Sequence, residues 1–519
     1  MFWVLAAVPF FLFLFSGSAL SQSTPNRSIE WFPCTLDIEG TPSTCGTLAV
    51  PLDYTEQGSE RLLNLSLIKV NATKEPFKGS VMFNPGGPGY PVRSILAGRS
   101  GEFFLNGTGG NFDLISFDPR CYDSSVDLQN ILLLTPLSSL SSDTAVGTAW
   151  AYKRTLAETC YENRKDIGDL IGTAFVARDM MQIVDALGED GMLRYWGFSY
   201  GSVLGATVAA MFPDRMDKVV LDGVLNLHQY YAGRDVEQLI AADESFNGFI
   251  EACVSSPETC ILAREGITAQ TLSTEINQLL ETIKYRPLGL GSNNTNDVVE
   301  YDLTEGLIIN GLRTPSTSWP ALAGYFDAIL KRNLTAYHEF RDTLLGGSIS
   351  AAFAVDANPG IRCSDVSLRT DNLTGLLPLI EEFQNTSRFG GGILAVAQPI
   401  TCAQWRFQAK ERYEGDFQVQ TKNPILLVGS PFDHITPLAS AQNHCSIGQP
   451  SLCTYKAIRE YFINGTLPDT GTQCDPDVTD FGKSSSTLSK RAAQDSEDAV
   501  LLNAALSVSQ DLLQRFRLF

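Results

Sequence analysis

The sequence has few histidines and few positive charges for its length. Its 519 residues include only 4 histidines, and none of these fall in the H-x-x-x-H spacing of a helical metal site, so metal-dependent hydrolysis is disfavoured. Lys and Arg number 38 against 58 Asp and Glu, which gives a net charge of -20. Because nucleic-acid binding needs cations that neutralise phosphates, this balance argues against a nucleic-acid partner. The acidity fits either attraction of cationic ligands or simple solubility.

The sequence also lacks internal repeats, heptads and any long apolar run beyond its first residues. That first run, FWVLAAVPFFLFLF, is followed by small residues, which is typical of a secretory signal peptide over residues 1–21. A membrane anchor is the alternative, but the run is shorter than the ~20 residues that a spanning helix needs. We therefore expect a secreted, extracellular protein without stable membrane insertion. Its 11 cysteines and its Asn-X-Ser/Thr glycosylation sites fit that compartment.

Short apolar runs alternate with stretches of helical periodicity over most of the chain. VMF, FDLISF, LRYW and KVVLD are typical of buried strands, and TAFVARDMMQIVDALG and VLGATVAAMFP are typical of helices. Strands that alternate with helices predict a largely parallel α/β sheet. After residue 232 the pattern becomes mostly helical, which indicates a domain inserted over one face of that sheet. A single simple core would not account for a chain of this length.

The motif Gly197-Phe198-Ser199-Tyr200-Gly201 stands between LRYW and SVLGATVAA. A G-x-S-x-G motif between a strand and a helix is typical of a nucleophile on a sharp turn, which lifts the serine hydroxyl above the sheet. Side chains at the two glycine positions would clash with the neighbouring helix and strand. We expect Ser199 to be the nucleophile. The alternative is a glycine-rich loop that matches the motif by chance.

A second glycine-rich segment, NPGGPG at residues 84–89, follows the predicted strand VMF. An oxyanion hole needs backbone N–H groups aimed at the oxygen of the tetrahedral intermediate, and glycine lets the backbone approach closely. We expect the N–H of Gly87 to be one donor. The N–H of Tyr200, the residue after the nucleophile, is the expected second donor. An ordinary Gly-Pro turn is the alternative.

Asp433 follows the predicted strand ILLVG and is the expected acid. In the chain order Ser, Asp, His, the base lies downstream of the acid. His228 and His338 precede Asp433, and His434 is its direct neighbour, whose side chain would usually diverge from it. By elimination His444 is the expected base, and the alternative is that it is structural or merely exposed.

Together these segments resemble the secreted tripeptidyl aminopeptidase-like branch of the α/β-hydrolases, serine peptidases related to proline iminopeptidases. The resemblance rests on CGTLAVPLDY, FNPGGPG, FDLISFDPR, GFSYGS, VVLDGV, PILLVGSPFDHITPL and HCSIGQPSLCTYKAIREYFINGTLPDTGTQC, which extend over roughly residues 31–475. It implies the same roles for Ser199, Asp433 and His444.

The resemblance implies an α/β-hydrolase fold, with a mostly parallel sheet and an inserted, mainly helical cap domain. We expect the core in residues 22–232 and 396–475, and the cap in residues 233–395. Residues 476–519 are expected to form a linker and a C-terminal helix that docks on the body; pairing with a partner or an uncertain gene end are the alternatives.

The resemblance also implies a serine exopeptidase that removes short peptides, often tripeptides, from free N-termini without a cofactor or a metal. Acidic groups of the cap would bind the substrate ammonium. Asp243 and Glu244 are candidates for this role, and the alternative is that both are solvated helix residues. A carboxylester hydrolase of the same fold is the second candidate function. A catalytically impaired homologue is the third.

The chain departs from the family pattern in three places. YPV follows NPGGPG instead of a Gly-Ser-Gly-like turn, and CYD follows DPR instead of Gly-x-Gly. Between Asp433 and His444 the chain has only HITPLASAQN, which suffices for a short helix but not also for the strand that precedes the base in the family. The segment is long enough to reach. What His444 would lack is the strand that orients its ring, and a misoriented base is a poor one.

Four disulfides are expected in addition, although the sequence alone does not fix their connectivity. They are Cys34–Cys45, Cys253–Cys260, Cys363–Cys402 and Cys453–Cys474. Cys121, Cys160 and Cys445 are then left over.

Overall fold

The computed structural model of the protein describes residues 28–34, 41–56, 58–90, 92–98, 100–120, 131, 134–292, 295–345, 357–430, 433, 435–436, 445–478, 480–482 and 496–515. The expected signal peptide, Cys121, His434 and His444 lie outside these residues. Within these ranges, no helix has the length and apolar character needed to cross a membrane.

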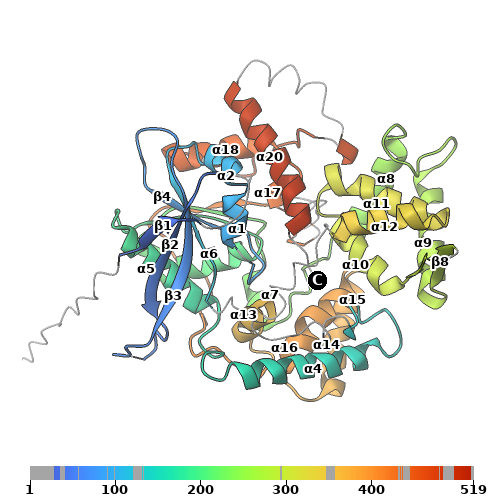
Figure 1. Ribbon diagram of the computed structural model, residues 1–519, viewed down its shortest axis with the longest axis horizontal. Helices are drawn as coiled ribbons and strands as arrows, with labels where there is room; N and C mark the ends of the chain where they lie inside the picture. Colours follow the sequence, from blue (N-terminus) through green and yellow to red (C-terminus); the bar gives the residue numbers. More distant parts are fainter. Residues whose placement is uncertain are drawn as a thin grey trace, which may run out of the picture.

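A sheet of eight strands forms the centre of the main domain (Figure 1). Its order is β1-β2-β3-β5-β4-β6-β7-β10. The first three strands are antiparallel, whereas β5, β4, β6, β7 and β10 run parallel to one another, so the predicted, mostly parallel sheet is confirmed. The strands are β1 (Glu30–Pro33), β2 (Thr44–Pro51), β3 (Leu62–Val70), β4 (Ser80–Asn84), β5 (Asp113–Phe117), β6 (Leu193–Phe198), β7 (Met216–Asp222) and β10 (Leu426–Val428).

The side chains of the central strands enter two apolar cores, one on each face of the sheet. Successive strand residues point to opposite faces. Tyr195 of β6 packs with α5 (Thr173–Leu187) and α6 (Tyr200–Met211). Its neighbour Trp196 packs with α2 (Ser100–Gly107) and α18 (Leu452–Asn464). Because both faces are covered, every residue of β6 is buried, Arg194 included.

The C-terminal helix α20 (Ser496–Arg515) covers part of the second face, beside α2 and α18 (Figure 1). Leu501 and Val508 are buried in the same core as Trp196. Asp498, in the first turn of α20, pairs with Lys456 and Arg459 of α18. The helix therefore docks on the main domain, as expected.

A mainly helical cap lies beside the sheet, and most of its helices share one apolar core (Figure 1). Its elements are α7 (Leu227–Ala232), α8 (Ala242–Ser255), α9 (Ala269–Tyr285), the hairpin β8 (Leu288–Ser292) and β9 (Thr295–Val299), α10 (Tyr301–Gly311), α11 (Pro315–Leu330), α12 (Leu334–Leu345), α13 (Ala357–Asp365), α14 (Leu373–Thr386), α15 (Gly391–Ala395) and α16 (Thr401–Ala403).

The cap extends beyond its expected range of residues 233–395, because α7 and α16 lie just outside it and two more distant segments also contribute. Helix α4 (Ala145–Asn163), which precedes α5, places Ala149 in the cap core. The short turn Asp480–Gly482 places the ring of Phe481 against Phe249 and Trp319. Residues 480–482, expected as part of a linker, therefore enter the cap before α20 returns to the sheet.

All four expected disulfides are present, with their sulfur atoms at bonding distance. Cys363–Cys402 joins α13 to α16, and Cys453–Cys474 ties α18 to the segment that follows it. Cys160 and Cys445 take no part in these four pairs and are buried.

A buried ion pair holds the segment after β5 against α5. Arg120 donates to both carboxylate oxygens of Asp179, at 2.8 and 2.6 Å, and to the carbonyl of Leu52 at 2.8 Å. Tyr54 donates its hydroxyl to the same carboxylate at 2.8 Å. Both charged side chains are almost fully buried, with exposed fractions of 1% and 0%. Removing one partner would leave the other charge uncompensated inside the protein.

We therefore expect Arg120→Ala to lower the free energy of unfolding by about 3–5 kcal/mol. Arg154→Ala is the matched control, because Arg154 pairs with Glu158 and both side chains are more than half exposed. That change should cost less than about 1 kcal/mol. Chemical denaturation of both variants checks this, and equal losses would contradict the assignment.

Candidate active site

Ser199 occupies the sharp turn between β6 and α6. Its backbone has φ 53° and ψ −121°, a region that non-glycine residues rarely adopt. The N–H of Ser199 donates to the carbonyl of Asp222 at 2.9 Å, and the Ser199 carbonyl accepts from the N–H of Ser202 at 2.7 Å. The G-x-S-x-G segment thus adopts the strained turn that the motif predicts, with a half-buried serine at its apex.

The two glycines of the motif allow this turn to pack. A Cβ atom on Gly197 would lie 2.4 Å from the carbonyl oxygen of Gly201. One on Gly201 would lie 2.6 Å from the carbonyl oxygen of Asn84, at the end of β4. The spacing of the motif therefore follows from contacts within the turn and with the neighbouring strand.

The NPGGPG loop lies directly against the serine turn. Gly86 has φ +104°, and a Cβ atom there would be 2.7 Å from the Phe198 carbonyl oxygen and 3.3 Å from the Tyr200 nitrogen. Gly87, with φ +115°, packs against the ring of Tyr90. The two expected oxyanion donors, Gly87 and Tyr200, thus belong to segments that touch, and their role as donors stays a prediction.

Tyr200 also anchors the start of α6 through its side chain. Its hydroxyl lies 2.6 Å from Thr173 Oγ1. Thr173 donates its N–H and its hydroxyl to Asp365 at 2.7 and 2.6 Å, and Tyr230 donates to the same carboxylate at 2.9 Å. Burial raises the pKa of Asp365 to about 6, and the hydrogen bonds from Thr173 and Tyr230 oppose this shift.

Asp433 is fully buried and its carboxylate is held by its own turn. Oδ1 accepts the N–H groups of Ile435 and Thr436, each at 2.8 Å. Oδ2 accepts the hydroxyl of Thr436 and the N–H of Cys445, the latter at 2.9 Å. Four donors stabilise the ionised form of the carboxylate, as the acid of a triad requires.

Cys445, the residue that follows His444, lies between Asp433 and the turn of Ser199. Its N–H is bound to Asp433, as described above, and its Sγ lies 3.5 Å from the carbonyl oxygen of Asp222. That same oxygen accepts the N–H of Ser199. The assignment of the base to His444 stays a prediction, because His444 is outside the described residues.

The two histidines that the structure describes, His228 and His338, lie elsewhere. His228 is exposed on α7, where its ring faces Phe417. His338 on α12 bonds to Asp297 of the cap hairpin at 2.9 Å.

Among the described strands, β10 forms one edge of the sheet, and Leu427 at that edge is 60% exposed. The segment between Asp433 and His444, where the family has a strand before the base, lies mostly outside the described residues, so the effect of its shortness stays a prediction.

Sequence reasoning missed two charged residues near this site. Asp222, at the end of β7, contacts the residues that follow His444. Arg313, between α10 and α11, is buried and interacts electrostatically with Tyr90, Cys445 and Asp433; its burial lowers its pKa. Arg313 comes from the cap, far from Asp433 in sequence, so no local pattern could have linked them. For Asp222, the segment VVLDGV predicts a strand that ends in an acidic residue, but it does not indicate which residues that acid contacts.

The two candidate amine-binding residues sit in the first turn of α8. The carboxylate of Asp243 accepts the hydroxyl of Ser387 at 2.7 Å and the N–H groups of Arg388 and Phe389 at 3.0 and 3.3 Å. Asp243 therefore joins α8 to the segment before α15. Glu244 is exposed. No hydrogen bond described for Asp243 connects it to the serine turn.

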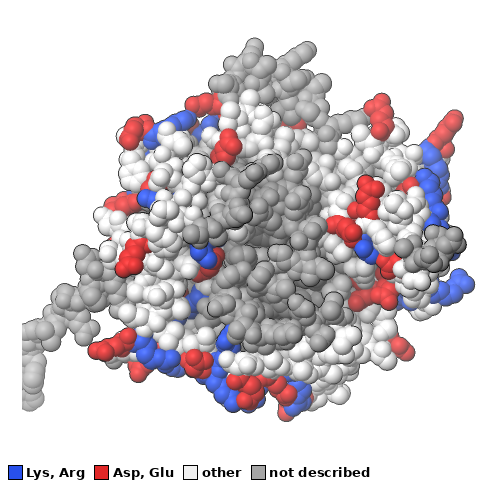
Figure 2. Space-filling model, viewed as in Figure 1, with Lys and Arg blue, Asp and Glu red and all other residues white. Residues whose placement is uncertain are grey.

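Charged side chains of both signs are interspersed around the described periphery of the face in Figure 2. On that part of the surface the net negative charge is not gathered into one acidic patch. On this face, the charge distribution fits the interpretation that the acidic composition serves solubility.

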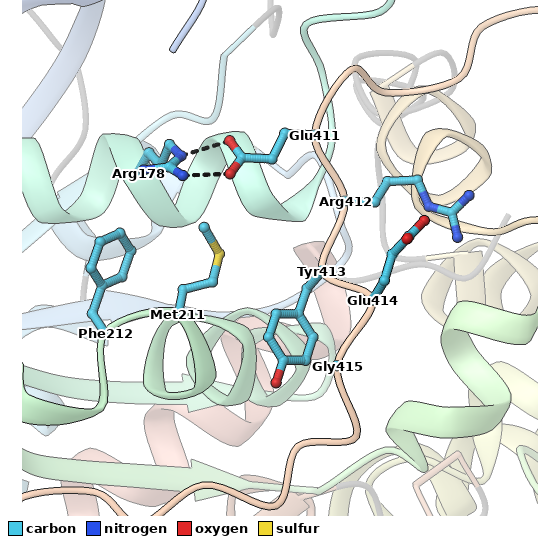
Figure 3. A pocket seen from close by; sticks show the side chains of 8 residues that line it. All are labelled: Arg178, Met211, Phe212, Glu411, Arg412, Tyr413, Glu414 and Gly415. Carbon is cyan, nitrogen blue, oxygen red and sulfur yellow. Dashed lines mark hydrogen bonds and ion pairs between the residues drawn. The ribbon is translucent and has the colours of Figure 1, made fainter. Parts of the chain in front are cut away.

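A separate pocket of about 380 Å³ lies at the far end of α6 (Figure 3). Its wall includes the paired side chains of Arg178 and Glu411, and Met211, Phe212 and Tyr413 also line it. Ser199 precedes the other end of α6. Since an α-helix rises 1.5 Å per residue, about 16 Å of helix separates the two. The pocket is therefore not the reaction site.

Comparisons with known proteins agree with this geometry. A family model described as the alpha/beta hydrolase fold matches residues 80–265. Serine protease Hip1 of Mycobacterium tuberculosis is 24% identical over 495 residues, covering 88% of this chain and 92% of the relative. Tripeptidyl aminopeptidase of Streptomyces lividans is 31% identical over 226 residues, 40% of this chain and 41% of the relative. Carboxylesterase B of M. tuberculosis is 26% identical over 497 residues, 88% of this chain and 90% of the relative.

The sheet, the serine turn and the family model that matches residues 80–265 show the α/β-hydrolase fold. More particularly, the chain is a serine hydrolase, similar in sequence to peptidases and to a carboxylesterase.

The contact between Gly86 and the serine turn leads to a prediction. Gly86→Ala should reduce turnover by about 100-fold, because misplacing reacting groups by about 1 Å has costs of that order. Gly58→Ala is the control, since Gly58 also has a positive φ, +81°, but nothing lies within 4 Å of its Cβ position. Turnover of an aryl ester would measure both, and equal activities would contradict the packing argument.

The raised pKa of Asp365 predicts that stability falls as the pH rises. The folded protein binds a proton at Asp365 up to about pH 6, whereas the unfolded chain releases it near its ordinary value of 3.8. This contribution is therefore complete below about pH 4 and is lost as the pH rises through about 6. Thermal unfolding from pH 4 to 8 should show a smaller decline in Asp365→Asn than in the wild type; an identical pH profile would contradict it.

Proposed function

We propose that this chain is a secreted serine exopeptidase that releases short peptides, tripeptides in the first instance, from the free N-termini of peptide substrates. The observation that carries the proposal is the position of Cys445, whose N–H binds Asp433 while its Sγ contacts the residue that holds Ser199. His444 precedes Cys445 directly. Cys445 is therefore linked to both Asp433 and the turn of Ser199, which supports a triad in which His444 is the base. The peptidase names of two relatives support the peptide substrate.

In the proposed reaction, Ser199 Oγ attacks the scissile carbonyl carbon while His444 takes the hydroxyl proton. Asp433 orients His444 and stabilises its charged form, and the N–H groups of Gly87 and Tyr200 bind the oxyanion. His444 then gives the proton to the leaving amine, the C–N bond breaks, and the N-terminal peptide remains esterified to Ser199. Water, deprotonated by His444, releases that peptide as a carboxylate and restores Ser199.

Recognition of the substrate ammonium by the cap remains part of the proposal. Of the two candidates, Glu244 has an exposed carboxylate, whereas Asp243 is already bound by three donors within the cap. Glu244 is therefore the better candidate of the two.

Secretion is supported by the four disulfides, because such bonds persist in oxidising compartments. The described asparagines of the glycosylation sites also support it, since each is exposed or half-buried; they are Asn64, Asn71, Asn106, Asn333, Asn372, Asn385 and Asn464.

Two other functions are favoured by specific observations. The similarity to carboxylesterase B favours an ester substrate at the same serine. The exposed edge of β10, where no further described strand pairs, favours a homologue in which the base is poorly oriented and catalysis is impaired.

Labelling with a fluorophosphonate should modify the wild type and fail in Ser199→Ala. Ser142→Ala, a change of an exposed serine, is the control and should label as the wild type does. Absence of wild-type labelling would establish the impaired homologue and overturn the peptidase. With a labelled enzyme, Ala-Ala-Phe-arylamide should be cleaved between phenylalanine and the arylamine. Turnover of short-chain aryl esters without peptide release would favour the esterase instead.

A further inference from the structure

Asp222 touches both halves of the proposed catalytic machinery. It is the last residue of β7, next to β6 in the sheet, and it is completely buried. Its carbonyl oxygen accepts the N–H of Ser199 at 2.9 Å. Its carboxylate accepts the N–H of Ser446 at 2.8 Å and the hydroxyl of Ser446 at 2.5 Å. One residue therefore binds the nucleophile through its backbone and the segment after His444 through its side chain.

Asp222 and Asp433 hold consecutive backbone N–H groups. Asp433 accepts the N–H of Cys445, and Asp222 accepts the N–H of Ser446. Cys445 has φ +56°, a strained value for a residue other than glycine. Such a conformation persists only where the surroundings determine it strongly, and the two carboxylates supply that constraint.

The next residue, Gly223, shows how closely the two segments approach. A Cβ atom on Gly223 would lie 2.4 Å from Cys445 Sγ and 2.8 Å from Thr436 Oγ1. The turn after β7 is thus in direct contact with both Thr436 and Cys445. This contact fixes the position of Cys445.

We propose that Asp222 is a positioning residue that holds Cys445 and Ser446 against the serine turn and thereby aligns His444 with Ser199. The proposal rests on the proposed function. It also fits the shortness of the sequence between Asp433 and His444, because a carboxylate at the end of β7 would align the base from the other side even if that segment formed no strand. Burial raises the pKa of Asp222 to about 7, and the nearby Asp433 adds to this shift, so the group is held there at an energetic cost.

The test compares steady-state kinetics and fluorophosphonate labelling rates in five variants. Asp222→Ala removes both hydrogen bonds to Ser446 and should lower kcat and the labelling rate by about 100-fold, with KM little changed, because a misaligned base acts on the chemical step. Asp222→Asn keeps an oxygen for the Ser446 N–H and should recover part of that loss. Ser446→Ala removes one of the two bonds and should have an intermediate effect.

Adding Ser446→Ala to Asp222→Ala should cost nothing further, since the two residues act through one contact. Asp302→Ala is the matched control, because the carboxylate of Asp302 on α10 of the cap also accepts two hydrogen bonds, here from the N–H groups of Leu137 and Ser138 at 2.8 Å each. It should lower the thermal midpoint while leaving kcat unchanged. Amide hydrogen exchange at residues 445–448 should accelerate in Asp222→Ala and not in Asp302→Ala.

The outcomes separate this inference from the function on which it rests. A wild type that fluorophosphonate does not label overturns the serine peptidase and, with it, the role of Asp222. A labelled wild type whose Asp222→Ala variant keeps its kcat overturns the positioning role alone. So does a kcat loss equal to that of Asp302→Ala, because that would reflect instability. If Asp222→Ala fails to fold, Asp222→Asn and Ser446→Ala carry the test.

Discussion

The close approach of two backbone turns is the constraint on which the site depends. The loop after β4 and the turn after β6 touch through glycine positions, so that a single extra carbon at Gly86 or Gly201 would collide with a carbonyl oxygen. This contact is possible because β4 and β6 are paired and parallel, so that both turns leave the same edge of the sheet. Ser199, the loop of residues 84–89 and the start of α6 are all positioned at that edge of the sheet.

The residues at the site come from distant parts of the chain, and the sheet brings them together. β6 delivers Ser199, the turn beyond β10 delivers Asp433, and β7 lies between β6 and β10. Asp222, at the end of this middle strand, therefore lies between the strand that precedes Ser199 and the strand that precedes Asp433. From that position its backbone carbonyl accepts the N–H of Ser199 and its carboxylate binds Ser446.

Local patterns in the sequence predicted the parts of the site that have local causes. The turn at Ser199 follows from two glycines between a strand and a helix, and the four disulfides and the parallel sheet were also predicted. The interactions of Arg313 and the contact of Asp222 with Ser446 could not be found in this way, because they join residues far apart in the sequence. For Asp243 the resemblance implied a candidate for binding the substrate ammonium, and this stays a prediction; the structure adds that its carboxylate binds Ser387 and the backbone N–H of Arg388.

The position of Phe481 bears on the order in which the protein can fold during its synthesis. The cap core is built mainly from residues that precede Phe481, yet the ring of Phe481 packs against Phe249 and Trp319. Domains generally fold as they leave the ribosome, N-terminal parts first. Here the cap core would keep an unfilled apolar gap beside Phe249 and Trp319 until residue 481 has been synthesised, so its packing would be completed only then.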